Sequence, residues 1–286
     1  MTIRSILAAT SGGPASAGAL AAACHLARCF DAHIECFHAQ LDPKELMLAA
    51  SYGDFGMILD GAWVEEMEQQ GEANALQAKA AALSLLQQRG IPIVENPPHA
   101  GASSAWRSEI GSSARLVPQR ARYFDLAVLG RSGRTVGLAH TDAIEQTLMQ
   151  SGRPVLLATA EGPGKLEDSI AIAWNGSAPA IHALAASLPI LKIARRVLLI
   201  GANADARQGL DEVQRYLGWH GIAGEIRNIA SASANAGGSL LASAQEEGAT
   251  LLVMGGFGHT PWRELLFGGA TREVIATMTL PVLLSH

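Results

Sequence analysis

The chain has little of several features that mark specialised classes of protein. Only 16% of its 286 residues are charged and only 5% are aromatic. The net charge is −5 and no block of like charge occurs, which argues against nucleic acid as the main partner. The five tryptophans are scattered along the chain, without the stacking pattern expected of a single-strand-binding surface.

Cysteine and long apolar runs are also scarce. Cys24, Cys29 and Cys36 are an odd set within one apolar region, so no disulfide framework is expected. No apolar run reaches the roughly 18 residues of a membrane span. The first residues lead into a strand pattern without a basic-then-apolar signal region. We therefore expect a cytoplasmic protein with no membrane span.

Short apolar runs alternate with alanine-rich, helix-like stretches throughout the first half. We expect strands at 3–10, 33–39, 91–94, 125–130 and 154–158, and helices at 15–30, 62–89, 103–123 and 140–150. Such βα alternation is typical of a doubly wound parallel sheet with helices on both faces.

The same order restarts after the polar linker 160–168. Strands are expected at 169–174, 196–200, 224–229, 250–254 and 280–284, and helices at 178–191, 207–218 and 238–247, with a last helix beginning near 270. Pro281–Leu284 repeats Pro154–Leu157 letter for letter. The sequence therefore predicts an internal duplication, with domains at 1–160 and 169–286 and an insertion around 41–75 in the first. Each domain is expected to hold a five-stranded parallel sheet flanked by helices.

Glycines gather after the strand at 250–254. The strand ends at Gly255-Gly256-Phe257-Gly258, a second pair follows at Gly268-Gly269, and a helix then starts with Ala270-Thr271. Glycine lets the backbone approach phosphate oxygens, and free N–H groups at a helix start point toward an anion. The pattern predicts a phosphate-binding loop; its plainer interpretation is a set of tight βα turns.

With the spacing Gly255-x2-Gly258-x9-Gly268, then a small residue and Thr271, the sequence resembles the universal stress protein family in its tandem two-domain form. The resemblance covers both halves. It implies a Rossmann-like fold of the adenine nucleotide alpha hydrolase type. It also implies a stress-response protein that binds ATP, ADP or AMP, with or without Mg²⁺, in its second domain.

The resemblance also implies which residues would lie at the nucleotide. They are Trp174, Asn175, Ile200, Gly201, Met254, Gly255, Gly258, His259, Gly268, Gly269, Ala270 and Thr271. Asn175 stands where the family usually has Asp, and Gly269 stands where it usually has Ser or Thr. We expect these departures to weaken binding rather than abolish it, because Asn keeps an acceptor oxygen. Arg263 and Arg272 could counter phosphate charge.

The first half lacks an equivalent second glycine pair. Gly130-Arg131-Ser132-Gly133 follows its fourth strand, and no glycine pair precedes its last helix. We expect this half to serve as a scaffold or to hold a different ligand. The sequence has no recognisable set of a nucleophile and a general base. It also has no pair of carboxylates beside the glycine loop that could hold a metal ion. ATP hydrolysis would therefore be slow and incidental, so a regulatory protein is favoured over an enzyme.

Several alternatives stay open. One is a family member that binds no nucleotide and acts only through contacts with an unknown protein partner. Another is an ATP pyrophosphatase-like enzyme, because Ser11-Gly12-Gly13-Pro14-Ala15-Ser16 resembles the Ser-Gly-Gly-x-Asp-Ser loop of the PP-loop class, with Ala15 in place of Asp. The resemblance further implies that the last strands of the two domains pair half against half, as an intramolecular pseudo-dimer. Further homodimerisation is left open.

A group of cysteines and histidines in the first half is the remaining candidate. Its members are Cys24, His25, Cys29, His33, Cys36 and His38. Zinc uses such residues, but no paired ligand spacing is present. Buried structural cysteines are the favoured interpretation.

Overall fold

The computed structural model describes residues 2–45, 61–95, 99–131, 138–162, 164–201, 207–227, 236–256 and 269–286. The elements of the first half are β1 (Ser5–Ala9), α1 (Pro14–Phe30), β2 (His33–Gln40), α3 (Gly61–Gln88), β3 (Ser103–Ile110), α4 (Ser113–Ala121), β4 (Leu126–Gly130), α5 (Leu138–Gln150) and β5 (Val155–Ala158). Those of the second half are β6 (Ile170–Trp174), α6 (Ala178–Leu191), β7 (Val197–Gly201), α7 (Arg207–Trp219), β8 (Glu225–Arg227), α8 (Ala236–Glu246), β9 (Leu251–Gly255), α9 (Gly269–Thr277) and β10 (Val282–Ser285).

The strands form one ten-stranded sheet in the order β3-β2-β1-β4-β5-β10-β9-β6-β7-β8. Each half therefore has the same internal order, and all neighbours within a half are parallel. The central strands are continuous apolar runs because helices bury both of their faces. The predicted α/β fold, with two doubly wound five-stranded repeats, is confirmed.

The two halves join through β5 and β10, the only antiparallel pair in the described sheet. Leu283 lies opposite Leu156, and Val282 opposite Leu157, so the repeated Pro-Val-Leu-Leu segments meet each other. All residues of both strands are buried. The predicted pairing of half against half is confirmed, and it removes two exposed sheet edges.

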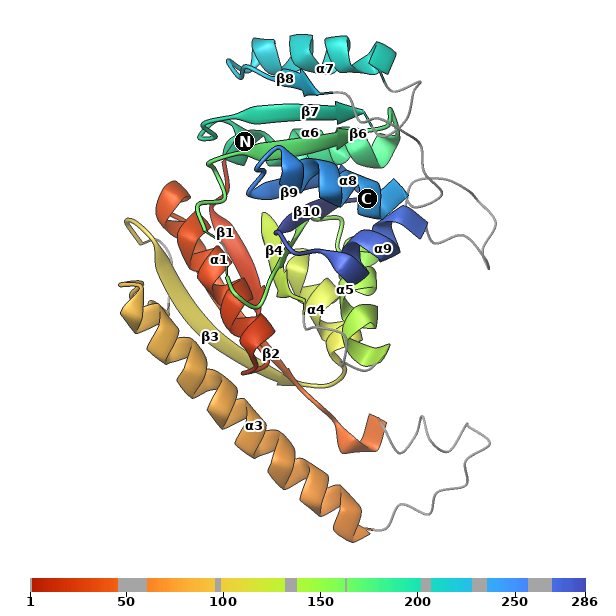
Figure 1. The fold of residues 1–286 in the computed structure, drawn as a ribbon. Helices are drawn as coiled ribbons and strands as arrows, with labels where there is room; N and C mark the ends of the chain where they lie inside the picture. The colour runs from red at the N-terminus through yellow and green to blue at the C-terminus, as the bar shows by residue number, and fades with distance from the viewer. Residues whose placement is uncertain are drawn as a thin grey trace.

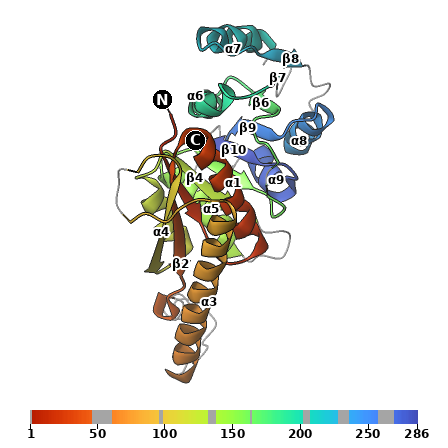
Figure 2. The ribbon, with the colours of Figure 1, turned by 90° about the vertical axis from the view of Figure 1, so that its left-hand side faces the viewer.

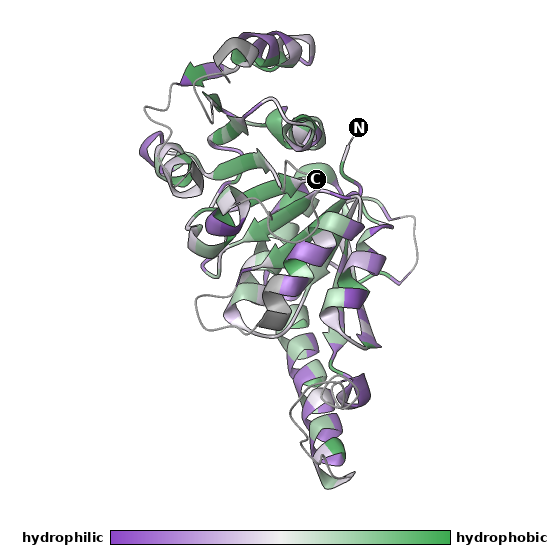
Figure 3. Cartoon of the chain, turned by 90° about the vertical axis from the view of Figure 1, so that its right-hand side faces the viewer, coloured by the Kyte–Doolittle hydropathy of each residue, from purple (hydrophilic) through white to green (hydrophobic). Residues whose placement is uncertain are grey.

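Helices cover the two faces of the sheet in separate groups. On one face α1, α3, α6 and α7 pack over a core that contains Ile6, Ile170 and Leu184. On the other face α4, α5, α8 and α9 pack over a core with Leu7, Leu148 and Ile275. Figure 2 shows α6 and α8 on opposite sides of the sheet, and in Figure 3 the strands are the most hydrophobic layer. α3 projects beyond the sheet (Figure 1), and only Gly71, Ala78, Ala82 and Leu86 of its residues are buried.

The helix predicted at 103–123 is wrong in its first part. Residues Ser103–Ile110 form strand β3, which pairs in parallel with β2 along its full length, and only Ser113–Ala121 are helical. The segment 91–94, predicted as the third strand, makes a single bridge beside the start of β3. Pro92 has no N–H to donate, and its carbonyl accepts from the Ser104 N–H at 2.8 Å. β3 is an edge strand with a charged Arg107–Glu109 pair, so its sequence lacks the apolar alternation of a buried strand.

No helix in the described part of the chain is long and apolar enough to cross a membrane.

Candidate functional site

In sheets of this kind, ligands bind beyond the carboxyl ends of the strands, at the point where the strand order reverses. The fold has two such points, between β1 and β4 and between β6 and β9. The registers are equivalent, because Ala8 lies opposite Val128 in the first half and Ile172 opposite Val253 in the second. Counting two residues on, Gly130 and Gly255 occupy the same position at the two switch points.

Both of these glycines allow a strand to approach a helix start very closely. A Cβ atom on Gly130 would lie 2.0 Å from the Ala15 carbonyl oxygen, and one on Gly255 would lie 2.5 Å from the Ala180 nitrogen. Neither distance is compatible with a side chain. Packing of the sheet against α1 and α6 therefore accounts for these two glycines without a ligand.

Asn175 lies at the carboxyl end of β6 and is exposed. Its Oδ1 atom accepts hydrogen bonds from the Ser177 N–H at 3.1 Å and from the Ser177 hydroxyl at 2.7 Å. The Ser177 hydroxyl in turn accepts from the Ala180 N–H and caps α6. Asn175 thus organises the turn into α6 with its acceptor oxygen, and its amide NH₂ group donates to neither partner.

The side chains near the carboxyl ends of β7 and β9 are buried. Ile200 and Met254 are 1% and 5% exposed, so a ligand at this edge would meet their main-chain atoms. Trp174 pairs with Gly201, which brings the ends of β6 and β7 side by side. Gly201 and Gly255 are partly exposed at the ends of β7 and β9.

The side chain of Trp174 lies away from the α8/α9 face. It packs against the core beneath α6 and α7. A Cβ atom on Gly209 of α7 would lie 2.6 Å from its Nε1 atom. The indole is therefore held between β6 and α7, and only the backbone of Trp174 borders the switch point on the other face.

α9 begins at Gly269, where a Cβ atom would meet no atom of the described residues within 4 Å. Thr271 is in its first turn and is 4% exposed, and no acidic residue lies in that turn. Arg272, predicted as a counter-charge for phosphate, lies with its Nε atom 3.2 Å from Oε1 of Glu145 in α5. Four of the residues predicted for this site lie outside the described part of the chain: Gly258, His259, Arg263 and Gly268.

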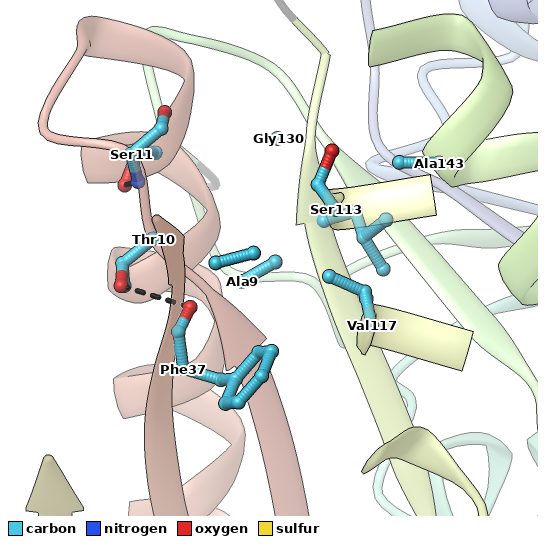
Figure 4. Close-up of a pocket in the computed structure, with 11 residues that line it drawn as sticks. Ala9, Thr10, Ser11, Phe37, Ser113, Val117, Gly130 and Ala143 are labelled. Atoms are coloured by element: carbon cyan, nitrogen blue, oxygen red, sulfur yellow. Dashed lines mark hydrogen bonds between the residues drawn. The ribbon is translucent and has the colours of Figure 1, made fainter. Parts of the chain in front are cut away.

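The first half holds a pocket of about 130 Å³ at its own switch point (Figure 4). Hydroxyl groups of Thr10, Ser11, Ser16 and Ser113 line it, together with the Phe37 ring and other apolar side chains. The Thr10 hydroxyl donates to the Phe37 carbonyl at 3.0 Å, and the Ser11 N–H donates to the Ser16 hydroxyl at 2.9 Å. Sequence reasoning named Ser11 and Ser16 only as part of the PP-loop alternative and did not name Thr10 or Ser113.

The signal that could have found this pocket was the repeat itself. The register places Thr10 at the position of Trp174 and Ser11 at that of Asn175. The incomplete glycine loop of the first half led to the expectation of a scaffold or a different ligand there. Its strand ends, however, keep the same geometry as those of the second half.

The cysteines and histidines of the first half make separate contacts. Cys24 and Cys36 are buried, and burial raises the pKa of the Cys24 thiol to about 11 and also raises that of Cys36. Cys29 is exposed, so the expectation that the cysteines are buried is wrong for this one. The His38 ring lies 2.8 Å from the Thr10 carbonyl oxygen. Among the described residues, no three His, Cys, Asp or Glu side chains gather closely enough to hold a metal ion.

These observations define a doubly wound α/β protein with two equivalent switch points. Residues 192–286 match the model of the Universal stress protein family. The matched region covers β7 to β10, most of the second half, and the first half repeats the strand order of the second.

Solved structures show the same fold along the whole chain. A universal stress protein from Archaeoglobus fulgidus DSM 4304 is 16% identical, with a TM-score of 0.69 over 98% of this chain and 97% of that one. A putative universal stress protein from Pseudomonas aeruginosa UCBPP-PA14 is 14% identical, with a TM-score of 0.57 over 99% of this chain and 93% of that one. At these identities the similarity concerns the fold alone. No curated protein sequence matches the chain.

Proposed function

We propose that this chain is a cytoplasmic stress-response protein that binds an adenine nucleotide at the switch point of its second half. The observation that carries the proposal is the open first turn of α9. It follows β9 in the chain, and the Gly255 end of β9 lies at the switch point beside the end of β6. N–H groups at a helix start attract phosphate, and the carboxyl edge of the sheet supplies room for the rest of the nucleotide.

Charge at this edge supports an anionic ligand. The first turn of α9 holds no acidic residue, and the carboxylate of Glu273, further along the helix, accepts from the Gly237 N–H at 3.2 Å. That contact directs the negative group toward α8. Gly269 leaves space where a side chain would otherwise shield the helix N–H groups.

The proposed role is regulation rather than catalysis. Asn175, Gly201, Gly255 and Gly269 carry neither a nucleophile nor a general base. The nearby His286 ring lies 3.2 Å from the Gly256 carbonyl oxygen, and Thr271 is buried in the first turn of α9. Bound nucleotide would contact the start of α9 and change the surface offered to a partner protein. The match of residues 192–286 to the Universal stress protein family supports a role in the response to stress.

Substitutions at Gly269 test the proposal at a site where a side chain fits. Gly269→Asp places a carboxylate at the start of α9, which favours the helix but repels phosphate. We expect ATP to raise the melting temperature of the wild type and to leave that of Gly269→Asp unchanged. Gly269→Ser should restore a hydroxyl and tighten binding severalfold. Isothermal titration calorimetry with ATP, ADP and AMP, each with and without Mg²⁺, measures the affinities.

A second candidate site is the pocket of the first half, because a cavity lies at its switch point. At about 130 Å³ it is smaller than the ~300 Å³ or more of typical ligand pockets, so it would enclose only one group of a nucleotide. Ser113→Asp is the matched variant, since Ser113 is the first residue of α4 and lines this pocket.

The pair of Asp variants separates the two sites. If only Gly269→Asp loses the ATP-dependent rise in melting temperature, the nucleotide site is in the second half. If only Ser113→Asp loses it, the site is in the first half. If Ser11→Ala abolishes binding as well, the PP-loop alternative gains support. A wild-type protein with no shift at millimolar ATP would leave the partner-only alternative.

A further inference from the structure

A second cavity, of about 260 Å³, lies on the opposite face of the sheet from the proposed nucleotide site. It opens between α6 and α7, which Figure 2 places together on the side away from α8. Its lining consists of Trp174, Ile181, Leu184, Glu212, Val213 and Tyr216. No residue was assigned to a ligand on this face from the sequence, apart from Trp174, whose side chain turns toward it.

The walls of this cavity are held in place by packing. Leu184 and Val213 are each 3% exposed and belong to the core. The Trp174 indole is fixed against α7 at Gly209, where any side chain would collide with its Nε1 atom. Tyr216 is at the opening, and its ring meets His220 edge to face at 4.8 Å between centroids. Buried side chains and the Trp174 indole thus form the inner walls, and the Tyr216 ring lies at the more exposed rim.

The internal repeat shows that this space is particular to the second half. The corresponding groove of the first half, between α1 and α3, retains only about 30 Å³. Ala78, Ala82 and Leu85 of the long helix α3 line that remnant, and Ala78 and Ala82 are buried there. α7 is 13 residues long and leaves the groove over α6 open.

The charge of the lining favours a cation. Among the described residues of the lining, Glu212 is the only ionisable group apart from the Tyr216 phenol, and none is basic. An anion such as a nucleotide would therefore meet the negative charge of the Glu212 carboxylate with no positive group among the described lining residues. A positive group would instead be attracted, because a carboxylate and aromatic rings both interact favourably with a cation.

Glu212 has a present partner that a ligand would displace. Arg215, one turn further along α7, donates to both carboxylate oxygens, at 3.0 and 3.1 Å. The side chains are 67% and 68% exposed. Pairs this exposed contribute little to stability, so exchange of the guanidinium for a ligand cation costs little.

We propose that the cavity between α6 and α7 binds a small organic cation, a substituted ammonium group on an apolar body. The apolar body lies against Leu184, Val213 and Ile181, and the ammonium group lies toward the rings of Trp174 and Tyr216 and the carboxylate of Glu212. A volume of about 260 Å³ suits a ligand below drug size. The cavity and the proposed nucleotide site lie on opposite faces of the sheet and share Trp174, whose side chain lines the cavity and whose backbone borders the switch point.

Benzyltrimethylammonium is a suitable probe, with benzyl alcohol as the neutral analogue and phenylacetate as the anionic one. Binding to the full chain is measured by calorimetry and by ligand-observed NMR. We expect the cation to bind at least about fivefold more tightly than the neutral analogue, and phenylacetate to bind least. Equal binding of the three probes, or none of the cation at millimolar concentration, overturns the proposal.

Variants of the lining and of its neighbour Arg215 should change the affinity for the cation in opposite directions. Glu212→Gln and Tyr216→Leu should each lower the affinity for the cation about fivefold or more. Arg215→Gln frees the Glu212 carboxylate and should raise that affinity. Asp211→Asn is the matched control, since Asp211 is the exposed neighbour of Glu212 outside the lining, and it should have no effect. An unchanged affinity in Glu212→Gln, or equal weakening in Asp211→Asn, contradicts the assignment. Tyr216 is on the rim, so its replacement tests the ring without removing a core residue.

Discussion

At the scale of single residues, the segment between the halves is tied to α1 by one ionisable pair. Oε2 of Glu167 lies 2.6 Å from Nε2 of His25, and both side chains are about one-fifth exposed. Burial acts to raise the pKa of the Glu167 carboxyl. Hydrogen bonds from its own backbone N–H and from His25 outweigh that effect and hold the pKa below its usual value.

This lowered pKa predicts an acid-sensitive contribution to stability. The contribution is complete above the unfolded-state pKa of about 4.3, and it is lost as the pH falls through the lower folded-state pKa. We expect Glu167→Gln to lower the free energy of unfolding at pH 7, and the difference from wild type to shrink on acidification below pH ~4. Urea titrations at several pH values measure it. A difference independent of pH would count against the contact, and Glu65→Gln on exposed α3 serves as the control.

The three cysteines should differ in reactivity toward an aromatic disulfide reagent. Cys29 is exposed. Partial desolvation of its thiol and the nearby Glu167 carboxylate raise its pKa, which slows its reaction. Cys24 and Cys36 are buried with raised pKa values. We expect one thiol to react in the native protein and all three in denaturant. Cys29→Ser should remove the native reaction, and persistent labelling in that variant would contradict the burial of the other two.

At the scale of elements, glycines govern how strands and helices approach each other. Gly130→Ala and Gly255→Ala would each force a methyl group into the backbone of a helix start. We expect each to cost about 2–3 kcal/mol or more in the free energy of unfolding, as overpacking does. Gly269→Ala is the control, because its Cβ meets open space and alanine favours a helix. Chemical denaturation measures all three, and a neutral Gly255→Ala would restore a purely ligand-binding role for that glycine.

The elements also show which local patterns identify a strand. Buried central strands such as β4 and β9 are continuous apolar runs and were predicted within one or two residues. β3 was predicted as a helix, because an edge strand with Arg107 and Glu109 offers no apolar alternation. Its identity depends on pairing with β2, and that partner lies some 70 positions away in the chain, as His33 and Ser103 illustrate. A sequence window contains no information about such a partner.

At the scale of the whole molecule, Arg131 joins the two halves. It follows Gly130 at the end of β4, and its guanidinium donates to the carbonyl groups of Ala276 and Met278 at the carboxyl end of α9. Cations are favourable at helix carboxyl ends. One side chain of the first half therefore stabilises the helix whose other end borders the proposed nucleotide site.

Replacing Arg131 should consequently weaken the contact between the halves. We expect Arg131→Gln to lower the free energy of unfolding by about 1–2 kcal/mol and the melting temperature by a few degrees. Arg107→Gln, which removes an exposed ion pair with Glu109, should change either value by less than about 1 kcal/mol. Calorimetry measures both variants. Equal effects of the two would mean that the Arg131 contacts carry no special weight.

The sequence by itself determined the α/β class, the duplication and most element positions. Strands buried on both faces of the sheet are continuous apolar runs, and helices show a helical period of apolar residues, so both can be recognised from local sequence. The resemblance to the universal stress protein family also implied that the last strands of the two halves pair with each other, and the structure confirms this pairing. Only the tertiary structure decided that Ser103–Ile110 is a strand and that the side chain of Trp174 lies on the α7 face. Only the tertiary structure, likewise, opened a groove over α6 where α3 fills its counterpart. These features depend on which distant segments pack together, and packing between distant segments is a property of the folded chain.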